Sequence, residues 1–319
     1  PQEGLSTRGV SSPIEPRWLQ LLCLSLVVMR CQPLRRALYF FGGRVDFPTD
    51  RIYKFASFSE NSISALADSS VWFSKVKNLN DPFEGFVIAS EPKDDDEKIT
   101  KLIKFGAESL KGQTTPEQAI EVATQRYLSD GESFIAKMTD AINELKVQRD
   151  AFFDSLCVFS TSVDMPEYPY PNYANMLMWS HYGNGFSGFC LQFSASKFYR
   201  SIQESNPKVA WSTVDYVSSP SKFEFVDYLN PDNIEYCRPI LTKHEQWAYE
   251  GELRFLSRNE GLHRYSTDSL EAIFIGEKMP IGQQKVILAI AKVHFPNVKV
   301  LKVCIHPSGY NVVTEEIKI

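Results

Sequence analysis

The chain has 319 residues, of which 43% are hydrophobic and 23% are charged, and its formal net charge is −5. This is the composition of a globular protein, and the length is sufficient for one large core or two smaller ones. The negative net charge excludes a bulk electrostatic attraction to duplex DNA or to an anionic membrane surface. We therefore expect neither duplex DNA nor a membrane as a partner.

The first fifty residues differ in character from the rest of the chain. An apolar run over residues 18–29 is shorter than the roughly 20 residues that a membrane-spanning helix needs. Basic residues precede this run, as in a signal peptide, but no cleavage site of small residues follows it. We expect residues 1–50 to be an extension outside the domain and residues 51–319 to form one domain. An interfacial anchor is the alternative for the extension.

The cysteines indicate a reducing compartment. None forms a C-x-x-C pair, and the six are Cys23, Cys31, Cys157, Cys190, Cys237 and Cys304. Three of them lie in apolar, strand-like runs, and buried thiols of this kind are typical of cytosolic proteins, so we predict a cytoplasmic protein. The five histidines lack the spacing of zinc ligands, and we predict no metal site.

The domain begins with two predicted strands and a short helix. Residues 51–55 and 71–74 are rich in aromatic and β-branched side chains, which favour strands. Between them, the hydroxyl of Ser59 can accept a hydrogen bond from a free amide of a first helical turn. This predicts a helix that ends near Leu66.

A helical pattern then occupies residues 92–153. Asp94-Asp95-Asp96 opens the first helix, where acids complement the helix dipole; a metal site is the alternative interpretation. Thr115-Pro116-Glu117-Gln118 predicts a capped start with proline at the first helical position. A third helix is expected over about 131–153. We interpret this block as a helical insertion lying on a β core.

The second half of the chain predicts more β-structure. The expected elements are a strand at 156–161, a helix ending at 179–182, a strand at 186–193, a helix end at 243–247, strands at 250–257 and 272–276, a helix at 282–294, and a terminal hairpin of 298–305 with 310–319. Together with the insertion, this pattern predicts an α+β fold with a central, mostly antiparallel sheet.

Glu250 and Glu252 are the most informative pair of acids. Residues spaced i, i+2 on a strand point to the same side, about 6–7 Å apart at the backbone, and Arg254 continues the row. A half-buried carboxylate pair beside an arginine suits general base catalysis or the binding of a cationic centre. The structural alternative is a solvated strand face with a surface Glu–Arg pair, which contributes little to stability.

A second candidate is the helix end that carries Trp179, Ser180, His181 and Tyr182. The Gly183-Asn184-Gly185 break that follows can aim an imidazole and a phenol into a cleft. We therefore consider His181 and Tyr182 as catalytic or ligand-contacting residues, with a structural hydrogen bond as the alternative for the histidine. Trp179 is either a packing residue or a stacking wall for a flat ligand.

Two further signals are weaker. Asp81 and Glu84 flank Pro82-Phe83, which is typical of a turn in which the aspartate binds backbone amides and the phenylalanine fills the core. Ser160-Thr161-Ser162 at the end of a strand either bind a ligand or terminate the strand. Each signal gains weight only if these residues meet the acids described above.

Taken in order, these motifs resemble a bacterial family known only as a domain of unknown function. The resemblance covers about residues 51–280 and implies an intracellular bacterial protein without a settled activity; the character of the family suggests a defence or toxin role. The motifs are Tyr53-Lys54-Phe55, Trp72-Phe73-Ser74, Asn80-Asp81-Pro82-Phe83-Glu84, Phe159-Ser160, Met178-Trp179-Ser180-His181-Tyr182, Gly188-Phe189-Cys190, Lys243, Trp247-x-Tyr249-Glu250-x-Glu252-x-Arg254 and Ile275-Gly276.

The order of an arginine, a Ser-Thr-Ser strand and Glu-x-Glu is also similar to ADP-ribosyltransferases of the arginine–serine–glutamate class. This resemblance implies that NAD is the substrate. It assigns the binding of the NAD phosphates to Arg51, with Lys54 as a rival, and the support of the nicotinamide pocket to Ser160 and Ser162.

In the same class, the last glutamate stabilises an oxocarbenium-like transition state. The resemblance assigns that role to Glu252 and the steering of an acceptor to Glu250. The physics is coherent, because a positive charge that develops on ribose needs a fixed carboxylate nearby. Two features depart from the class: Arg254 shares a face with Glu252, and the helix end at 179–182 has no counterpart.

Three hypotheses follow. The first is an NAD-using ADP-ribosyltransferase or glycohydrolase that binds a small nucleotide and acts on an unknown macromolecular acceptor. The second is a nuclease-like or other hydrolase in which His181 and a carboxylate form an acid–base pair. The third is a non-catalytic module that binds a nucleotide or a protein through Trp179, Tyr182 and the acids.

Overall fold

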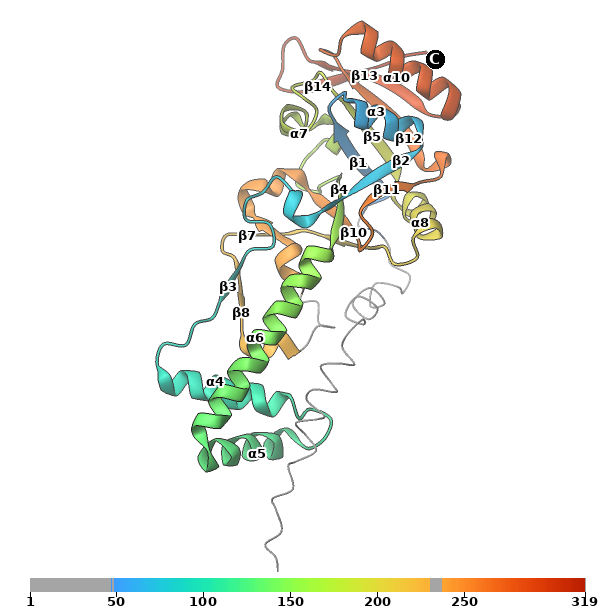
Figure 1. Cartoon of the computed structure of the whole chain (residues 1–319). Helices are drawn as coiled ribbons and strands as arrows, with labels where there is room; N and C mark the ends of the chain where they lie inside the picture. Colours follow the sequence, from blue (N-terminus) through green and yellow to red (C-terminus); the bar gives the residue numbers. More distant parts are fainter. Residues whose placement is uncertain (1–46, 48, 230–236, 319) are drawn as a thin grey trace, which may run out of the picture.

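The computed structural model describes residue 47, residues 49–229 and residues 237–318. The apolar run at 18–29, Cys23 and Cys31 lie outside these residues. The molecule is elongated, with a large sheet at one end and an arm of helices at the other (Figure 1). In the described part of the chain, no helix combines the length and the apolarity needed to cross a bilayer.

The predicted α+β fold with a mostly antiparallel sheet is confirmed. The main sheet of the described chain has ten strands in the order β11-β2-β4-β1-β5-β12-β13-β14, with β10 and β6 continuing from β4. All its ladders are antiparallel except that between β12 and β13. The strands are β1 (Arg51–Ala56), β2 (Ser70–Lys75), β4 (Cys157–Val163), β5 (Phe189–Ser194), β6 (Ala210–Thr213), β10 (Glu252–Ser257), β11 (Gly261–Arg264), β12 (Leu270–Gly276), β13 (Lys299–Ile305) and β14 (Val312–Glu316).

Helices cover the sheet and bury its apolar side chains. They are α3 (Glu60–Ala67), α7 (Met176–His181), α8 (Ala195–Ser205) and α10 (Ile281–His294). Aromatic side chains from strands and helices, among them Phe159, Phe198 and Phe255, form the largest core. Ser59 caps α3 in a reciprocal capping box with Ser62, as the sequence predicts for its N-terminus.

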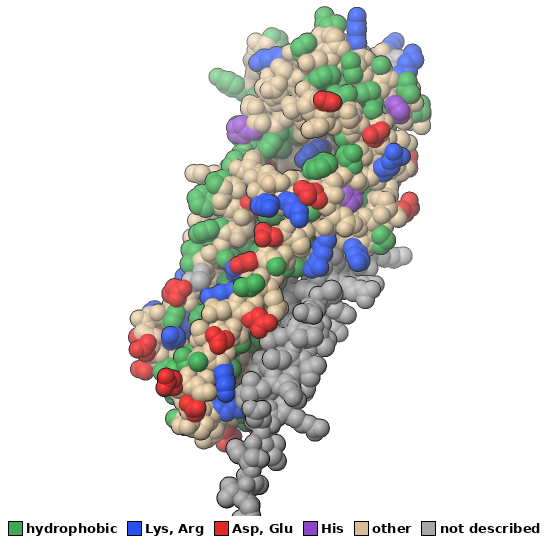
Figure 2. All heavy atoms as spheres, viewed as in Figure 1, with side chains coloured by type: hydrophobic (Ala, Val, Ile, Leu, Met, Phe, Trp, Pro, Cys, Tyr) green, Lys and Arg blue, Asp and Glu red, His purple; other side chains and the backbone are tan. Residues whose placement is uncertain are grey.

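Three helices lie where the sequence predicts them and form the arm in Figure 1: α4 (Asp95–Glu108), α5 (Pro116–Ser129) and α6 (Gly131–Ser155). Asp94 accepts a hydrogen bond from the amide of Glu97, so the acidic run acts as a helix start. Thr115 and Gln118 form the predicted capping box. Acidic and basic side chains are interspersed over this arm in Figure 2.

Short strands and turns of 3₁₀-helix make up the rest of the regular structure in the described residues. Two parallel pairs are β3 (Val87–Ala89) with β8 (Ser221–Phe223) and β7 (Asp215–Val217) with β9 (Thr242–His244). The single turns of 3₁₀-helix are η2 (Val76–Asn78), η3 (Asn172–Ala174), η4 (Phe225–Leu229), η5 (Arg238–Ile240), η6 (Glu245–Glu250) and η7 (Thr267–Ser269). The terminal hairpin of β13 and β14 is confirmed.

Two sequence predictions fail in the same short stretch. The expected helix end at 243–247 is instead the end of β9 followed by η6. The strand expected from Glu250 begins at Glu252, because Gly251 adopts a left-handed conformation with φ of 51°. A side chain at Gly251 would also meet the Met165 side chain at 2.8 Å, so a glycine is favoured here on two grounds.

The sheet forks at β4, and this fork positions the candidate site. Along one edge, β4 pairs with β10 over its whole central length. Along the other edge, it pairs with β1 at Ser162 and Val163 and with β2 at Cys157 and Val158. Residues 159–161 lie between these two ladders, so β1 and β2 diverge from each other at this point. No strand in the part of the chain that the structure describes pairs with this edge of β4 between them, so the edge faces the side chains of neighbouring elements.

Candidate functional site

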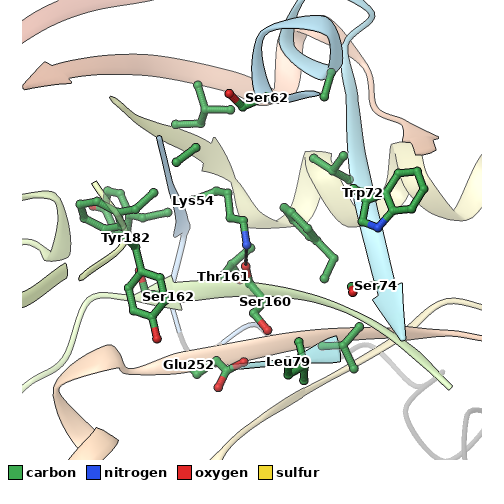
Figure 3. Close-up of a pocket in the computed structure, with 18 of the residues that line it drawn as sticks. Lys54, Ser62, Trp72, Ser74, Leu79, Ser160, Thr161, Ser162, Tyr182 and Glu252 are labelled. Carbon is green, nitrogen blue, oxygen red and sulfur yellow. Dashed lines mark hydrogen bonds between the residues drawn. The ribbon is translucent and has the colours of Figure 1, made fainter. Parts of the chain in front are cut away.

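A cavity of about 650 Å³ opens at the fork. Its volume lies within the roughly 300–1,000 Å³ that is typical of small-molecule sites. Strands β1, β2, β4 and β10 and helix α3 contribute its walls, and the lining side chains converge from these elements in Figure 3. The same face of the molecule is hollowed in Figure 2. The lining is mostly apolar or hydroxyl-bearing, and a cluster of ion-paired residues, which we call the charged side of the cavity, consists of Glu84, Lys243, Glu250, Glu252 and Arg254.

The Lys54 side chain extends from β1 to β4. Its Nζ donates a hydrogen bond to the carbonyl oxygen of Ser160 at 2.8 Å and lies 5.0 Å from the centre of the Phe159 ring (Figure 3). Burial lowers the pKa of Lys54, and the negative charges of Glu252 and Glu250 oppose only part of that change. An ammonium group has three donors, so this side chain retains capacity to bind a ligand.

Arg254 is buried and fully hydrogen-bonded. Its Nε and one Nη hold the two oxygens of Glu252 at 2.8 and 2.9 Å. The two Nη atoms also donate to the two carboxylate oxygens of Glu84, and one of these hydrogen bonds is 2.9 Å long. One Nη donates in addition to the carbonyl oxygen of Ile240 at 2.7 Å. All five donors of the guanidinium therefore have acceptors, which fixes Glu252 in one orientation.

A second ion pair adjoins the first. Lys243 lies with its Nζ 2.6 Å from Glu250 and 3.6 Å from Glu252, and 4.6 Å from the centre of the Trp247 ring. The Tyr182 hydroxyl donates a short hydrogen bond to Glu250. Lys243 thereby joins the two glutamates into one buried network.

The two glutamates have opposite pKa changes. Burial alone would raise the pKa of Glu252, but Arg254 and Lys243 outweigh it and hold this pKa below its usual value. Burial also raises the pKa of Glu250, and there Lys243 and Tyr182 do not overcome it. The site therefore holds one firmly ionised carboxylate next to one that takes up a proton more readily, a pattern that suits acid–base chemistry.

Most of the predicted site residues line this cavity. They are Lys54, Ser160, Ser162, Tyr182, Glu250 and Glu252. In register across three neighbouring strands, Tyr53 lies opposite Ser162, and Ser162 lies opposite Glu252. The expected same-side row of Glu252 and Arg254 is present, but it is buried rather than solvated. The interpretation as a surface Glu–Arg pair is therefore wrong.

Three other predicted residues do not line the cavity. Arg51 is exposed at the start of β1, opposite Ser194. His181 is also exposed, and its Nδ1 lies 2.7 Å from the hydroxyl of Tyr249. Trp179 is fully buried, stacks on Phe186, and has its indole nitrogen bonded to a backbone carbonyl. Of its two predicted roles, the structure supports packing.

Three residues that complete the site are not among the predicted site residues, although Arg254 is noted beside the two glutamates and Lys243 and Trp72 belong to the family motifs. Lys243 and Arg254 supply the cations that pair with the two glutamates, and Trp72 lines the cavity as an exposed aromatic side chain. Lys243 lies at the end of β9 and Glu250 at the end of η6, so their spacing of seven residues follows neither strand nor α-helical periodicity and carries no signal in the sequence. Asp81 and Glu84 separate: Asp81 accepts the amide of Phe83 in the predicted turn, whereas Glu84 reaches the cavity. Phe83 is largely exposed rather than in the core, which corrects that prediction.

Among the residues with described positions, no group of three or more histidine, cysteine, aspartate or glutamate side chains is arranged to hold a metal ion. The carboxylates of the cavity are instead occupied by lysine and arginine partners. Cys157 and Cys190 are buried free thiols, as predicted, and Cys237 and Cys304 are partly buried free thiols.

Comparison with known proteins gives one family match. The model of a family described as a protein of unknown function (DUF2971) matches residues 178–255. This stretch contains Tyr182, Lys243, Glu250, Glu252 and Arg254, and thus most of the charged side of the cavity. No curated protein and no solved structure gives a significant match to the chain. The chain is therefore similar, over this stretch, to a domain family of unknown function.

Proposed function

We propose that the cavity binds NAD and that the protein cleaves the bond between nicotinamide and ribose, transferring ADP-ribose to water or to a macromolecular acceptor. The observation that supports this most is the row of three adjacent strands, β1, β4 and β10, which brings Lys54, Ser160 and Glu252 to one cavity. These are the residue types, on separate strands, that the reaction needs.

Glu252 has the properties of a transition-state carboxylate. In the reaction, the bond from ribose C1′ to nicotinamide breaks, and its electron pair leaves with nicotinamide. Positive charge then develops on the ribose, and a nucleophile forms a bond to C1′ and loses its proton. A carboxylate that stays ionised and is held rigid stabilises this charge. Arg254 provides the rigidity and the lowered pKa of Glu252 provides the charge.

Lys54 and Glu250 take the supporting roles. Lys54, rather than the exposed Arg51, faces the cavity and is suited to a phosphate oxygen. Glu250 has a raised pKa and is suited to accept the proton that the attacking nucleophile loses. Ser160 and Ser162 lie between the lysine and the glutamates on β4.

The test is nicotinamide release from NAD by purified protein, with and without cell lysate as a source of acceptors. We expect release by the wild type and a loss of about a hundredfold or more in Glu252→Gln, because removal of a preorganised electrostatic group costs this much. Glu315→Gln, an exposed glutamate on β14, is the matched control and keeps full activity. Absence of release from the wild type under both conditions rules the proposal out.

A further inference from the structure

Trp72 is a large aromatic side chain left exposed at the cavity. It lies on β2, lines the cavity, and has 55% of its surface accessible to solvent. Its neighbours on the same strand, Val71 and Phe73, are buried in the core. The alternation of a strand therefore directs the indole away from the core and to the cavity side.

The residues around Trp72 are suited to bind a flat heterocyclic ring with polar atoms at its edge. Leu262, its partner across the β2–β11 ladder, also lines the cavity and is 54% exposed. Ser70 and Ser74, two residues away on either side, line the same wall. From α3, Asn61 contributes an exposed amide, whereas the hydroxyl of Ser62 is engaged in the capping box. An apolar platform ringed by small hydrogen-bonding groups leaves room for a base and can bind its edges.

The charged residues lie away from this platform. In Figure 3, Trp72 stands at one side of the cavity and Tyr182 at the other, with Lys54 between them. Glu252 belongs to the charged side through its contacts with Lys243 and Arg254. A ligand that places its reacting ribose at Glu252 and a phosphate at Lys54 would extend its far end towards Trp72.

We infer that Trp72 is the stacking platform for the adenine base of the ligand. This inference rests on the proposed function, because it takes the ligand to be a dinucleotide whose nicotinamide end lies at Glu252. Stacking of a base on an aromatic side chain uses the face of the ring, and Ser74 and Asn61 can bind the polar edge of the base. Trp72 thereby contributes to affinity and not to bond cleavage.

The test measures the binding of NAD, AMP and nicotinamide mononucleotide to the full chain by calorimetry. In Trp72→Ala we expect binding of AMP and NAD to weaken by about tenfold or more, the range that loss of one stacked base gives. Nicotinamide mononucleotide, which has no adenine, binds with unchanged affinity. Trp72→Phe restores most of the affinity. Tyr310→Ala, which removes a fully exposed ring outside the cavity, changes nothing.

The outcomes separate the two proposals. If NAD binds to the wild type and Trp72→Ala binds NAD and AMP equally well, the stacking inference is wrong while the proposed function stands. A variant that loses affinity for nicotinamide mononucleotide but not for AMP also overturns it. If NAD does not bind to the wild type, the proposed function itself fails. Thermal unfolding of each variant checks that it is folded.

Discussion

Glu84 and Arg254 are 170 positions apart in the sequence and form a buried, two-pronged ion pair. Glu84 lies in the turn that follows β2 and η2, and Arg254 lies in β10. The pair thus ties a surface turn to the central sheet, and through Arg254 it also determines where Glu252 points. One guanidinium couples the position of a loop to the orientation of the carboxylate to which we assign the reaction.

We predict that breaking this pair destabilises the fold strongly. Arg254→Met leaves two buried carboxylates without their partner and should cost about 3–5 kcal/mol in the free energy of unfolding. Arg254→Lys retains the charge but loses the forked geometry, so we expect an intermediate loss. Urea denaturation measures both values.

The matched control for this prediction is a surface ion pair. Lys111 and Glu108 are 2.7 Å apart on the helical arm, and the lysine side chain is 72% exposed. Lys111→Met should change stability by no more than about 1 kcal/mol. If Arg254→Met were no more destabilising than this control, the buried network would not hold Glu252 in place.

The two glutamates should give stability profiles of opposite sign with pH. The pKa of Glu250 is raised above 4.5, so the folded protein binds this proton more tightly than the unfolded chain does. Wild type therefore loses stability relative to Glu250→Gln as the pH rises from 4.5 through the raised pKa. The pKa of Glu252 is lowered, so wild type gains stability relative to Glu252→Gln as the pH rises from the lowered pKa to 4.5.

Chemical denaturation of the three proteins at a series of pH values measures these differences. Each variant is compared with the wild type at the same pH, so changes common to the whole chain cancel. If the stability of wild type relative to Glu250→Gln and relative to Glu252→Gln changed in the same direction with pH, one carboxylate could not be firmly ionised and the other readily protonated.

The sequence predicts local structure well and the site only in part. Strands such as β1 and β4 and the capped helices α3 and α5 follow from short-range patterns, because each depends on residues within a few positions. Strand β10 begins two residues later than the alternation predicts, because the left-handed conformation of Gly251 is not evident from the sequence around it.

The sequence predicts which residues of the site share one strand or one turn, but not which strands and turns meet in the folded protein. The resemblance assigns the phosphate role to Arg51 with Lys54 as its rival, and only the tertiary structure shows that Lys54 lines the cavity while Arg51 is exposed at the start of β1. His181 and Tyr182 are adjacent at the end of α7, but their side chains point in different directions, and only the tyrosine contacts Glu250. The partnership of Glu84 with Arg254 depends on tertiary packing and has no local signal.

We predict that Lys54 reacts as an amine at lower pH than an ordinary lysine. Burial lowers its pKa below 10.5, so a larger fraction is uncharged and nucleophilic at a given pH. Acetylation by a small anhydride, followed by peptide mass spectrometry at several pH values, should place the midpoint of its reactivity below that of Lys111 on the helical arm. Because two negative charges oppose the effect of burial, Glu250→Gln should move this midpoint lower still. Glu315→Gln, an exposed position on β14 outside the cavity lining, should leave it unchanged. A midpoint equal to that of Lys111 would contradict the lowering of the Lys54 pKa by burial.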